Sequence, residues 1–408
     1  MFKILYVCRL FNGLEQSVME EKWRPTGVPT IYQMIDRLNT SEANLKLILT
    51  AKDGFSEFAP QQNKNIYFDG FSNSVTVLKN HAGKRNRTIT KVWRETIHFI
   101  HIFKHFLLYR PDILYFDHGN IWAAGIFARS TRLPVILRAM GVYPSMREAV
   151  TTQTPSLFQR VLRWNYRAPY AMVICTQDGS GVEKWAAQAL SKTVPVSILL
   201  NGIPRPQSIE RLLQKKGKIK VTFLGKLEAA KGANKFIEAM LKVAEHSPNN
   251  FQFSLVGTGS LEKEIKKKIE ESKYKNCFNL ISRLENKLVF KLLHETDIYV
   301  SLNKYGNLSN ANLEAISAGC CIILPCSQQD HGIDLATDQL LNSETVWRLN
   351  DPEDAQELAN VVLELASSEK RRLKMSNRTL KLSENLPSWH DRTEYEFNKL
   401  KQIVNNSR

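Results

Sequence analysis

Short apolar runs alternate along this chain with longer stretches in which apolar residues recur every three or four positions. Such runs are typical of strands buried on both faces, and the wider spacing predicts amphipathic helices packed beside them. The alternation therefore predicts an α/β fold with parallel sheets and crossover helices. In the first half we expect strands at residues 2–8, 45–50, 113–116, 135–138, 171–175 and 197–200, and helices at 30–38 and 94–108.

The series breaks once, at residues 201–218, where NGIPRPQSIERLLQKKGK has two prolines, a lysine cluster and no core face. A second series follows, with strands expected at 220–224, 251–256, 278–281, 298–302 and 321–324, and a last helix around 392–404. We expect two Rossmann-like domains, 1–203 and 219–386, joined by a linker at 204–218. Their parallel sheets would face each other across a cleft that binds ligands, and residues 387–408 would pack back toward the N-terminal domain.

The net charge of +16 is concentrated in the first 200 residues, which carry 25 Lys and Arg against 14 Asp and Glu. This balance favours anionic partners, and nucleic acid is not expected because no motif that reads it accompanies the charge. No apolar run is long enough for a membrane span, and MFKILYV reads as a strand and not as a signal peptide. The six cysteines lack CxxC spacing, so a cytoplasmic location is expected.

The segment SLNKYGNLSNANLEAISAG, residues 301–319, places a turn-rich loop directly before a predicted helix that contains Glu314. The loop includes Gly306, Asn307, Ser309 and Asn310 and runs into Leu313-Glu314-Ala315, so Glu314 is expected in the first turn of the helix, with Asn312 just before it. A helix start offers unpaired N–H groups and the positive end of the dipole to an anion. Ordinary helix capping by Asn and Ser explains the loop equally well.

Two other loops carry candidate chemistry. LGKLEAAKG places Gly225 and Lys226 after a strand and Lys231 before a helix, and two ammonium groups there suit a diphosphate. Surface lysines are also commonly just solvated. LVGTGSLEKEI places Gly257 and Gly259 after a strand, where backbone could approach a ligand closely or simply make a tight turn.

Together these segments resemble the nucleotide-sugar domain of the GT-B glycosyltransferases, in particular glycosyltransferase family 4 (group 1). That family shows approximately G-R-L-x-x-x-K-G, then V-G-x-G, then L-E-A-M-A-x-G, and this chain has GKLEAAKG, LVGTGSL and NLEAISAG in that order. A weaker likeness extends to CTQDGSGVEKW and ILLNGI in the first half. The resemblance implies retaining, metal-independent transfer from a nucleotide-diphosphate sugar, with the donor phosphate assisting deprotonation of the acceptor hydroxyl.

The resemblance also implies roles for individual residues. Lys226 and Lys231 would neutralise the leaving diphosphate, Glu314 would bind the ribose hydroxyls, and the backbone of residues 307–312 would face diphosphate and sugar. Residues 282–284 would line the base pocket. In the first half, His118 of YFDHGN would contact the transferred sugar. Gly27 of RPTGVPT matches a glycine-rich loop that approaches donor phosphate or acceptor in the family, and a simple turn explains it equally well. The predicted catalytic residues are Lys226, Lys231 and His118, and the predicted donor-binding residues are Gly27, Gly225, Gly257, Gly259, Arg283, Leu284, Asn307, Asn310, Asn312 and Glu314.

Two positions depart from the family pattern. Gly306 stands where a second glutamate is common, eight residues before Glu314, which leaves the sugar open. Met140 of RAMGVYP stands where the family usually has histidine. These departures support the alternative of a catalytically silent GT-B scaffold or binding subunit. A nucleotide-sugar epimerase or a phosphorylase on the same fold is a further alternative.

The stretch from residue 79 to 110 combines charge with aromatic residues. Its basic residues are followed by an apolar helix, a combination suited to an anionic bilayer, although the helix could equally pack on the sheet. We expect a helix that is partly core, behind a basic loop that faces membrane or acceptor. The basic residues are Lys84, Arg85, Arg87, Lys91 and Arg94.

Metal and cofactor chemistry find little support in the sequence. His98, His101 and His105 share a helical face but have no partner carboxylate or cysteine, and Asp-x-Asp is absent. We expect no metal and no cofactor. The expected partners are a nucleotide-diphosphate sugar, a surface-polysaccharide or lipid-linked acceptor, and the anionic inner face of a membrane.

Overall fold

The computed structural model describes residues 1–11, 13–52, 62–81, 88–204 and 217–407. The chain forms two compact units. The first unit comprises Met1–Thr176, Val182–Leu199 and His390–Arg408, and the second comprises Gln177–Gly181 and Leu200–Trp389. The short segment Gln177–Gly181 thus belongs to the second unit, although residues of the first unit precede and follow it.

The first unit is built on an eight-stranded sheet in the order β3-β4-β2-β1-β5-β6-β7-β8. Pairing is parallel from β4 through β2, β1, β5 and β6 to β7, and the edge strand β3 runs antiparallel to β4. The strands are β1 Lys3–Arg9, β2 Asn44–Thr50, β3 Lys64–Ile66, β4 Val75–Leu78, β5 Ile113–Asp117, β6 Val135–Ala139, β7 Met172–Gln177 and β8 Val196–Leu200.

Helices cover both faces of this sheet because successive strand residues point to opposite sides. In β1, Leu5 and Val7 join one hydrophobic core with α3 and α4, whereas Ile4 and Tyr6 join another with α2 and α15. The helical elements are α1 Glu15–Glu20, α2 Pro29–Asn39, α3 Thr88–Tyr109, η1 His118–Asn120, α4 Ile121–Ser130, α5 Pro144–Thr151, α6 Leu157–Tyr166, α7 Val182–Ala189 and α15 Trp389–Ser407.

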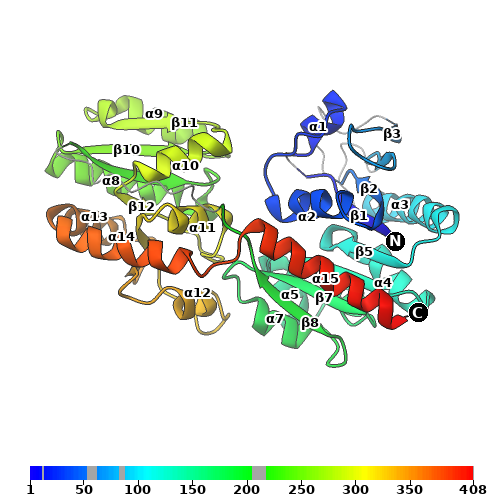
Figure 1. Ribbon diagram of the computed structural model, residues 1–408. Coiled ribbons are helices and arrows are strands. Elements are labelled where there is room, and N and C mark those ends of the chain that lie inside the picture. Colours follow the sequence, from blue (N-terminus) through cyan, green and yellow to red (C-terminus); the bar gives the residue numbers. More distant parts are fainter. Residues whose placement is uncertain (12, 53–61, 82–87, 205–216, 408) are drawn as a thin grey trace. The chain divides into compact units, whose positions relative to one another are not determined.

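A buried ion pair ties the last helix, red in Figure 1, to the first sheet. Glu396 of α15 accepts hydrogen bonds from Arg138 of β6, from Tyr115 of β5 and from Arg392 one turn away. Burial alone would raise the pKa of Glu396, but Arg138 and Arg392 outweigh it and hold the value at about 2. The C-terminal helix is therefore held by charge as well as by the apolar contacts of Phe397.

The second unit has a six-stranded parallel sheet in the order β11-β10-β9-β12-β13-β14. Its strands are β9 Ile219–Leu224, β10 Phe251–Val256, β11 Phe278–Ile281, β12 Ile298–Val300, β13 Cys321–Pro325 and β14 Val346–Leu349. Figure 1 shows helices on both faces of this sheet. The helical elements of the unit are η2 Ala229–Lys231, α8 Ala233–His246, α9 Glu262–Glu271, η3 Lys275–Cys277, α10 Asn286–His294, α11 Asn310–Ser317, α12 Leu335–Leu340, α13 Ala355–Ser367 and α14 Glu369–Ser383.

The predicted α/β class and the predicted strands are present, with bounds that shift by one or two residues. The helix predicted at 94–108 begins earlier, at Thr88, and the strands β3, β4 and β14 were not predicted. Most of the predicted linker, residues 205–216, lies outside the described residues. None of the described helices combines the length and the apolar character needed to cross a bilayer.

Candidate functional site

Two lysines flank the loop that follows β9 in the second unit. Lys226 is exposed, and Lys231 is half-buried at the end of η2. Burial lowers the pKa of Lys231; Asp178 opposes this shift, and the nearby positive charge of Lys226 adds to it. The two positive charges therefore repel each other, and a group with two negative charges would neutralise both.

Two glycines of the next loop hold this lysine loop in place. Gly257 has φ +147°, and a Cβ there would lie 1.9 Å from the carbonyl oxygen of Gly225. A Cβ at Gly259 would lie 2.4 Å from the carbonyl oxygen of Leu227. Only glycine at both positions lets the loop after β10 pack directly on the loop after β9. This packing fixes the backbone on both sides of Lys226. A direct contact of these glycines with donor stays a prediction.

The loop between β12 and α11 is held by its own asparagines. Asn307 Nδ2 donates to Asn303 O at 2.9 Å and to Asp334 Oδ2 at 2.7 Å, and its Oδ1 accepts from Ser301 Oγ at 2.9 Å. Asn312 Nδ2 donates to Asn307 O at 3.0 Å. Both side chains are buried, so any ligand contact at Asn307 and Asn312 falls to the backbone. That contact stays a prediction.

The start of α11 leaves backbone donors open. Ser309 caps the helix by accepting from the N–H of Asn312 at 3.4 Å. None of the described residues accepts a hydrogen bond from the N–H of Asn310 or Ala311, the first two residues of the helix. Capping by Ser309 therefore leaves two N–H groups available to an anion, and binding of an anion there stays a prediction.

Glu314 lies in the second turn of α11. Its side chain is half-buried, and no described residue donates a hydrogen bond to its carboxylate. Burial raises the pKa of Glu314 to about 7. A carboxylate kept partly from water without a partner among the described residues is costly. Its predicted contact with ribose hydroxyls stays a prediction.

The residues predicted for a base pocket follow β11. Arg283 is exposed, and Leu284 packs against the core that includes α10 and α11. Ser282 Oγ donates to Glu262 Oε1 at 3.0 Å. Their contact with a base stays a prediction.

Two aspartates that the sequence did not single out belong to this site. Asp334 accepts from the N–H of Asn307 at 2.6 Å, and its own N–H donates to Gly179 O at 2.6 Å. The N–H of Leu308 donates to Asp178 O at 3.0 Å. These hydrogen bonds hold the segment Gln177–Gly181 against the loop before α11. Asp178 then lies close enough to Lys231 for the positive charge to lower the pKa of its carboxyl group. Their partners lie far away in sequence, so no local pattern pointed to them.

The other two predicted site residues belong to the first unit. His118 Nε2 lies 2.9 Å from Tyr166 Oη, and burial lowers the pKa of His118 to about 4, which makes its ring neutral at pH 7. The neighbouring Asp117 accepts from the N–H of Arg9 at 2.8 Å and from Asn120 Nδ2 at 2.8 Å. Gly27 is exposed, with φ +71°, two residues before α2.

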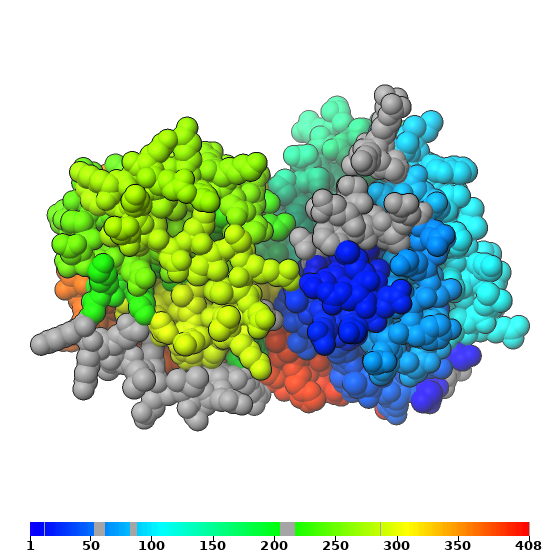
Figure 2. Space-filling view, turned by 90° about the horizontal axis from the view of Figure 1, so that it is seen from above, coloured from blue at the N-terminus to red at the C-terminus, as the bar shows by residue number. Residues whose placement is uncertain are grey.

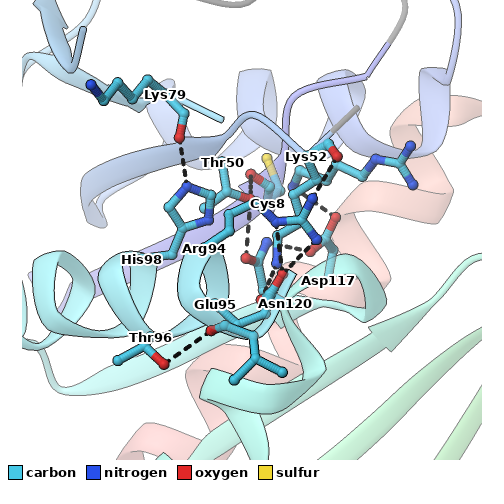
Figure 3. Close-up of polar contacts among 12 residues, drawn as sticks. Cys8, Thr50, Lys52, Lys79, Arg94, Glu95, Thr96, His98, Asp117 and Asn120 are labelled. Atoms are coloured by element: carbon cyan, nitrogen blue, oxygen red, sulfur yellow. Dashed lines mark hydrogen bonds and ion pairs between the residues drawn. The ribbon is translucent and has the colours of Figure 1, made fainter. Parts of the chain in front are cut away.

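A buried polar network occupies the carboxyl ends of the first unit's strands (Figure 3). Arg94 of α3 donates to Lys52 O at 2.7 Å and to Glu95 Oε1 at 2.9 Å, and Lys52 pairs with the same carboxylate. The interpretation of Arg94 as part of a basic loop is therefore wrong: it lies within α3 and is buried against its counter-ion. Lys84, Arg85 and Arg87 lie outside the described residues.

His98 and His101 of α3 each lie close to a polar atom of another segment. His98 Nε2 lies 2.8 Å from Lys79 O, and burial lowers the pKa of His98 to about 3. His101 Nε2 lies 3.1 Å from Asn63 Nδ2. Within the part of the chain that the structure describes, no three His, Cys, Asp or Glu side chains gather as a metal site would require.

The lysine loop, the glycine loop and the start of α11 all fall within the region that matches a known family. Residues 204–382 match the family model described as glycosyl transferases group 1. This region is a group 1 glycosyltransferase domain. The predicted glycosyltransferase class is thereby confirmed for this domain. No curated protein matches the chain.

Solved structures extend the likeness of this glycosyltransferase to its whole length. Sucrose-phosphate synthase from Thermosynechococcus elongatus matches with a TM-score of 0.72 and 14% identity, covering 100% of each chain. An alpha,alpha-trehalose-phosphate synthase (UDP-forming) from Burkholderia vietnamiensis matches with a TM-score of 0.66 and 11% identity over 98% of this chain and 100% of that one. A glycosyltransferase from Rickettsia africae gives 0.62 and 13%, over 99% of each. The predicted GT-B fold is confirmed.

Proposed function

We propose that this glycosyltransferase moves a sugar, with retention at the anomeric carbon, from a nucleotide-diphosphate donor to a hydroxyl of its acceptor. The observation that carries the proposal is a combination of groups in the second unit. It comprises Lys226 and Lys231, the N–H groups at the start of α11, and the carboxylate of Glu314, the last two without partners among the described residues. Cations and helix amides suit a diphosphate, and a carboxylate suits ribose hydroxyls.

The names of solved relatives support a uridine donor as the first to be tested. One is described as UDP-forming, and another structure holds UDP-2-fluoro glucose. A third is described in terms of glycosyl transfer with retention by trehalose-6-phosphate synthase. These descriptions apply to proteins at 10 to 12% identity, and for this chain they supply hypotheses.

In the proposed reaction the bond between the anomeric carbon and the diphosphate oxygen breaks, and a bond to the acceptor oxygen forms on the same face. The acceptor proton passes to an oxygen of the leaving diphosphate. Lys226, Lys231 and the amides of α11 stabilise the charge that grows on that diphosphate. We retain His118 and Gly27 of the first unit as proposed contacts, His118 as a neutral hydrogen-bonding group because its pKa is about 4.

We propose a surface-polysaccharide or lipid-linked acceptor presented at an anionic membrane. The support is the charge of the first 200 residues and the apolar face of α3, where Trp93 is 59% exposed, Phe103 42% and Leu107 54%. α3 lies within the sky-blue to cyan surface in Figure 2. A sugar phosphate is the second candidate acceptor, because the names of two relatives contain sucrose-phosphate and trehalose-phosphate.

Release of nucleoside diphosphate from a panel of UDP-, GDP- and ADP-sugars tests the proposal, with and without a lipid-linked saccharide or a hexose phosphate. We expect Lys231→Ala to lower turnover of the accepted donor by about 100-fold or more, as loss of one preorganised charge-stabilising group does. Lys266→Ala is the matched control, because Lys266 is an exposed lysine of α9 that pairs with Glu270.

Three results would contradict the proposal. Unchanged turnover in Lys231→Ala would remove the assigned role of the cation. Release of a free, altered sugar without an acceptor would indicate an epimerase. Absence of turnover and of binding across the whole panel would favour a silent scaffold.

A further inference from the structure

Position 306, where the family commonly has a glutamate, has no room for a side chain in this chain. Gly306 has φ +126°, a conformation that favours glycine. A Cβ there would lie 2.6 Å from Asp178 O, 2.6 Å from Ser180 N and 2.7 Å from Gly179 C. The space that a carboxylate would need on leaving position 306 is thus filled by the backbone of residues 178–180.

That backbone segment is fixed by several contacts. Leu308 N donates to Asp178 O at 3.0 Å, and Asp334 N donates to Gly179 O at 2.6 Å. Gly179 has φ +82°, and a Cβ there would lie 2.5 Å from Asp334 Oδ1. Glycines at positions 179 and 306 therefore allow the two segments to pack against each other. Together with the two hydrogen bonds, this packing fixes the position of residues 178–180 relative to the loop before α11.

The same segment carries a carboxylate. Asp178 Oδ1 accepts from Ser180 N at 3.0 Å and from Ser180 Oγ at 2.5 Å, and the N–H of Asp178 itself also acts on the carboxylate. Among the described residues no other group donates a hydrogen bond to this carboxylate. The side chain is half-buried. Burial raises the pKa of Asp178 to about 6, and the positive charge of Lys231 works in the opposite direction. Ser180 thus orients one oxygen, and no other described residue donates to the second oxygen of this carboxylate beside the proposed diphosphate-binding lysine.

We propose that Asp178 provides the carboxylate that position 306 lacks, with Oδ2 accepting a hydrogen bond from a hydroxyl of the transferred sugar. Asp178 then determines which sugar the donor carries, because a sugar without a hydroxyl at that place leaves the carboxylate unpaired. This inference rests on the proposed function, since it assigns the sugar contact within the same donor site.

The competing explanation is that Asp178 only shapes its own turn and balances the charge of Lys231. A purely structural role would change binding of the nucleoside diphosphate and of the nucleotide sugar alike. A sugar contact changes binding of the nucleotide sugar alone. Asp178→Asn keeps an acceptor for Ser180, Asp178→Ala removes the group, and Asp69→Asn alters an exposed carboxylate of the first unit as a control.

The test is calorimetric titration of these variants with UDP, ADP and GDP, and with the glucose and mannose derivatives of the base that the parent protein binds. We expect both Asp178 variants to bind the nucleoside diphosphate within about twofold of the parent protein. Binding of the preferred nucleotide sugar should weaken by about tenfold to a hundredfold, the range for one hydrogen bond to a charged group. If the contacted hydroxyl is the one at C2, the epimer that turns this hydroxyl away from Asp178 should bind parent and variants equally.

The results distinguish failure of the proposed function from failure of the role assigned to Asp178. A parent protein that binds none of the three nucleoside diphosphates overturns the proposed function, and this inference with it. If the parent binds a nucleoside diphosphate, the inference alone fails when the added sugar gains no affinity. It also fails when both Asp178 variants keep the affinity of the parent for the nucleotide sugar, or lose affinity equally for both ligands.

Discussion

At the scale of single residues, Glu314 combines burial with the absence of a partner among the described residues. A carboxyl group in a merely structural role would be expected to receive hydrogen bonds, as Glu396 does from Arg138 and Tyr115. The contrast indicates that Glu314 is maintained at a cost to stability. Such a cost is typical of binding sites, where a ligand supplies the missing contacts.

We expect Glu314→Gln to stabilise the protein at pH 8 while weakening nucleoside diphosphate binding. The pKa of Glu314 is raised from 4.5 to about 7 in the folded protein, so the unfolded chain ionises first as pH rises. Glu314 therefore leaves the free energy of unfolding unchanged below pH 4.5. It lowers that free energy progressively as pH rises from 4.5 to about 7, and the loss is complete above pH 7. Thermal unfolding at pH 5 and pH 8, with exposed Glu270→Gln as control, measures this difference.

A lower unfolding temperature for Glu314→Gln at pH 8 would contradict this account, because it would mean that the carboxylate makes stabilising contacts in the free protein. Equal affinity of variant and parent for the nucleoside diphosphate would contradict the binding role.

The sequence analysis singled out residues whose proposed chemistry can be recognised from a short motif. Lys226, Lys231 and Glu314 stand in short motifs at strand ends and at a helix start, and the structure places them in one unit. Asp178 and Asp334 escaped prediction because each acts through a partner more than 25 positions away, Lys231 and Asn307 respectively. The role of Gly306 also required the structure, since only the folded chain brings Gly179 against it.

At the scale of helices and strands, the alternation of apolar runs predicted the central strands of both sheets. Those strands are buried on both faces, so each reads as a continuous apolar run. The edge strand β3, KNI, has no such run and was missed. The start of α3 was missed because residues 88–93, TITKVW, carry no buried apolar face. The burial of Arg94 depends on Glu95 and the backbone of Lys52.

We expect α3 to bind anionic membranes through its exposed apolar face. Its inner face packs through Ile102, Phe99 and Phe106 on the sheet, so the outer side chains are free to enter a bilayer surface. Trp93→Ser with Leu107→Ser removes two of them, 59% and 54% exposed, and should weaken binding by at least about tenfold. Co-sedimentation with phosphatidylglycerol vesicles measures the effect.

Tyr395→Ser, an equally accessible aromatic residue of α15 at 46% exposure, is the control and should bind as the parent protein does. A parent protein that fails to sediment with phosphatidylglycerol vesicles would contradict membrane binding. Equal binding to neutral phosphatidylcholine vesicles would contradict the contribution of charge.

At the scale of the whole molecule, the chain has two α/β units, and the family match at residues 204–382 lies within the second. The likeness to solved GT-B structures covers both units, whereas the candidate diphosphate site is built from the second alone. The second unit therefore carries the central claim, that Lys226, Lys231 and the start of α11 bind the diphosphate of a nucleotide donor.

Calorimetric titration with UDP, and with GDP and ADP in parallel, tests that claim most directly in the whole protein and in the double variant Lys226→Ala, Lys231→Ala. We predict that the parent binds at least one of the three and that the double variant binds it about 100-fold more weakly or worse, because two charge-assisted contacts are lost. Absence of binding to all three by the parent, or unchanged affinity in the double variant, would contradict the account.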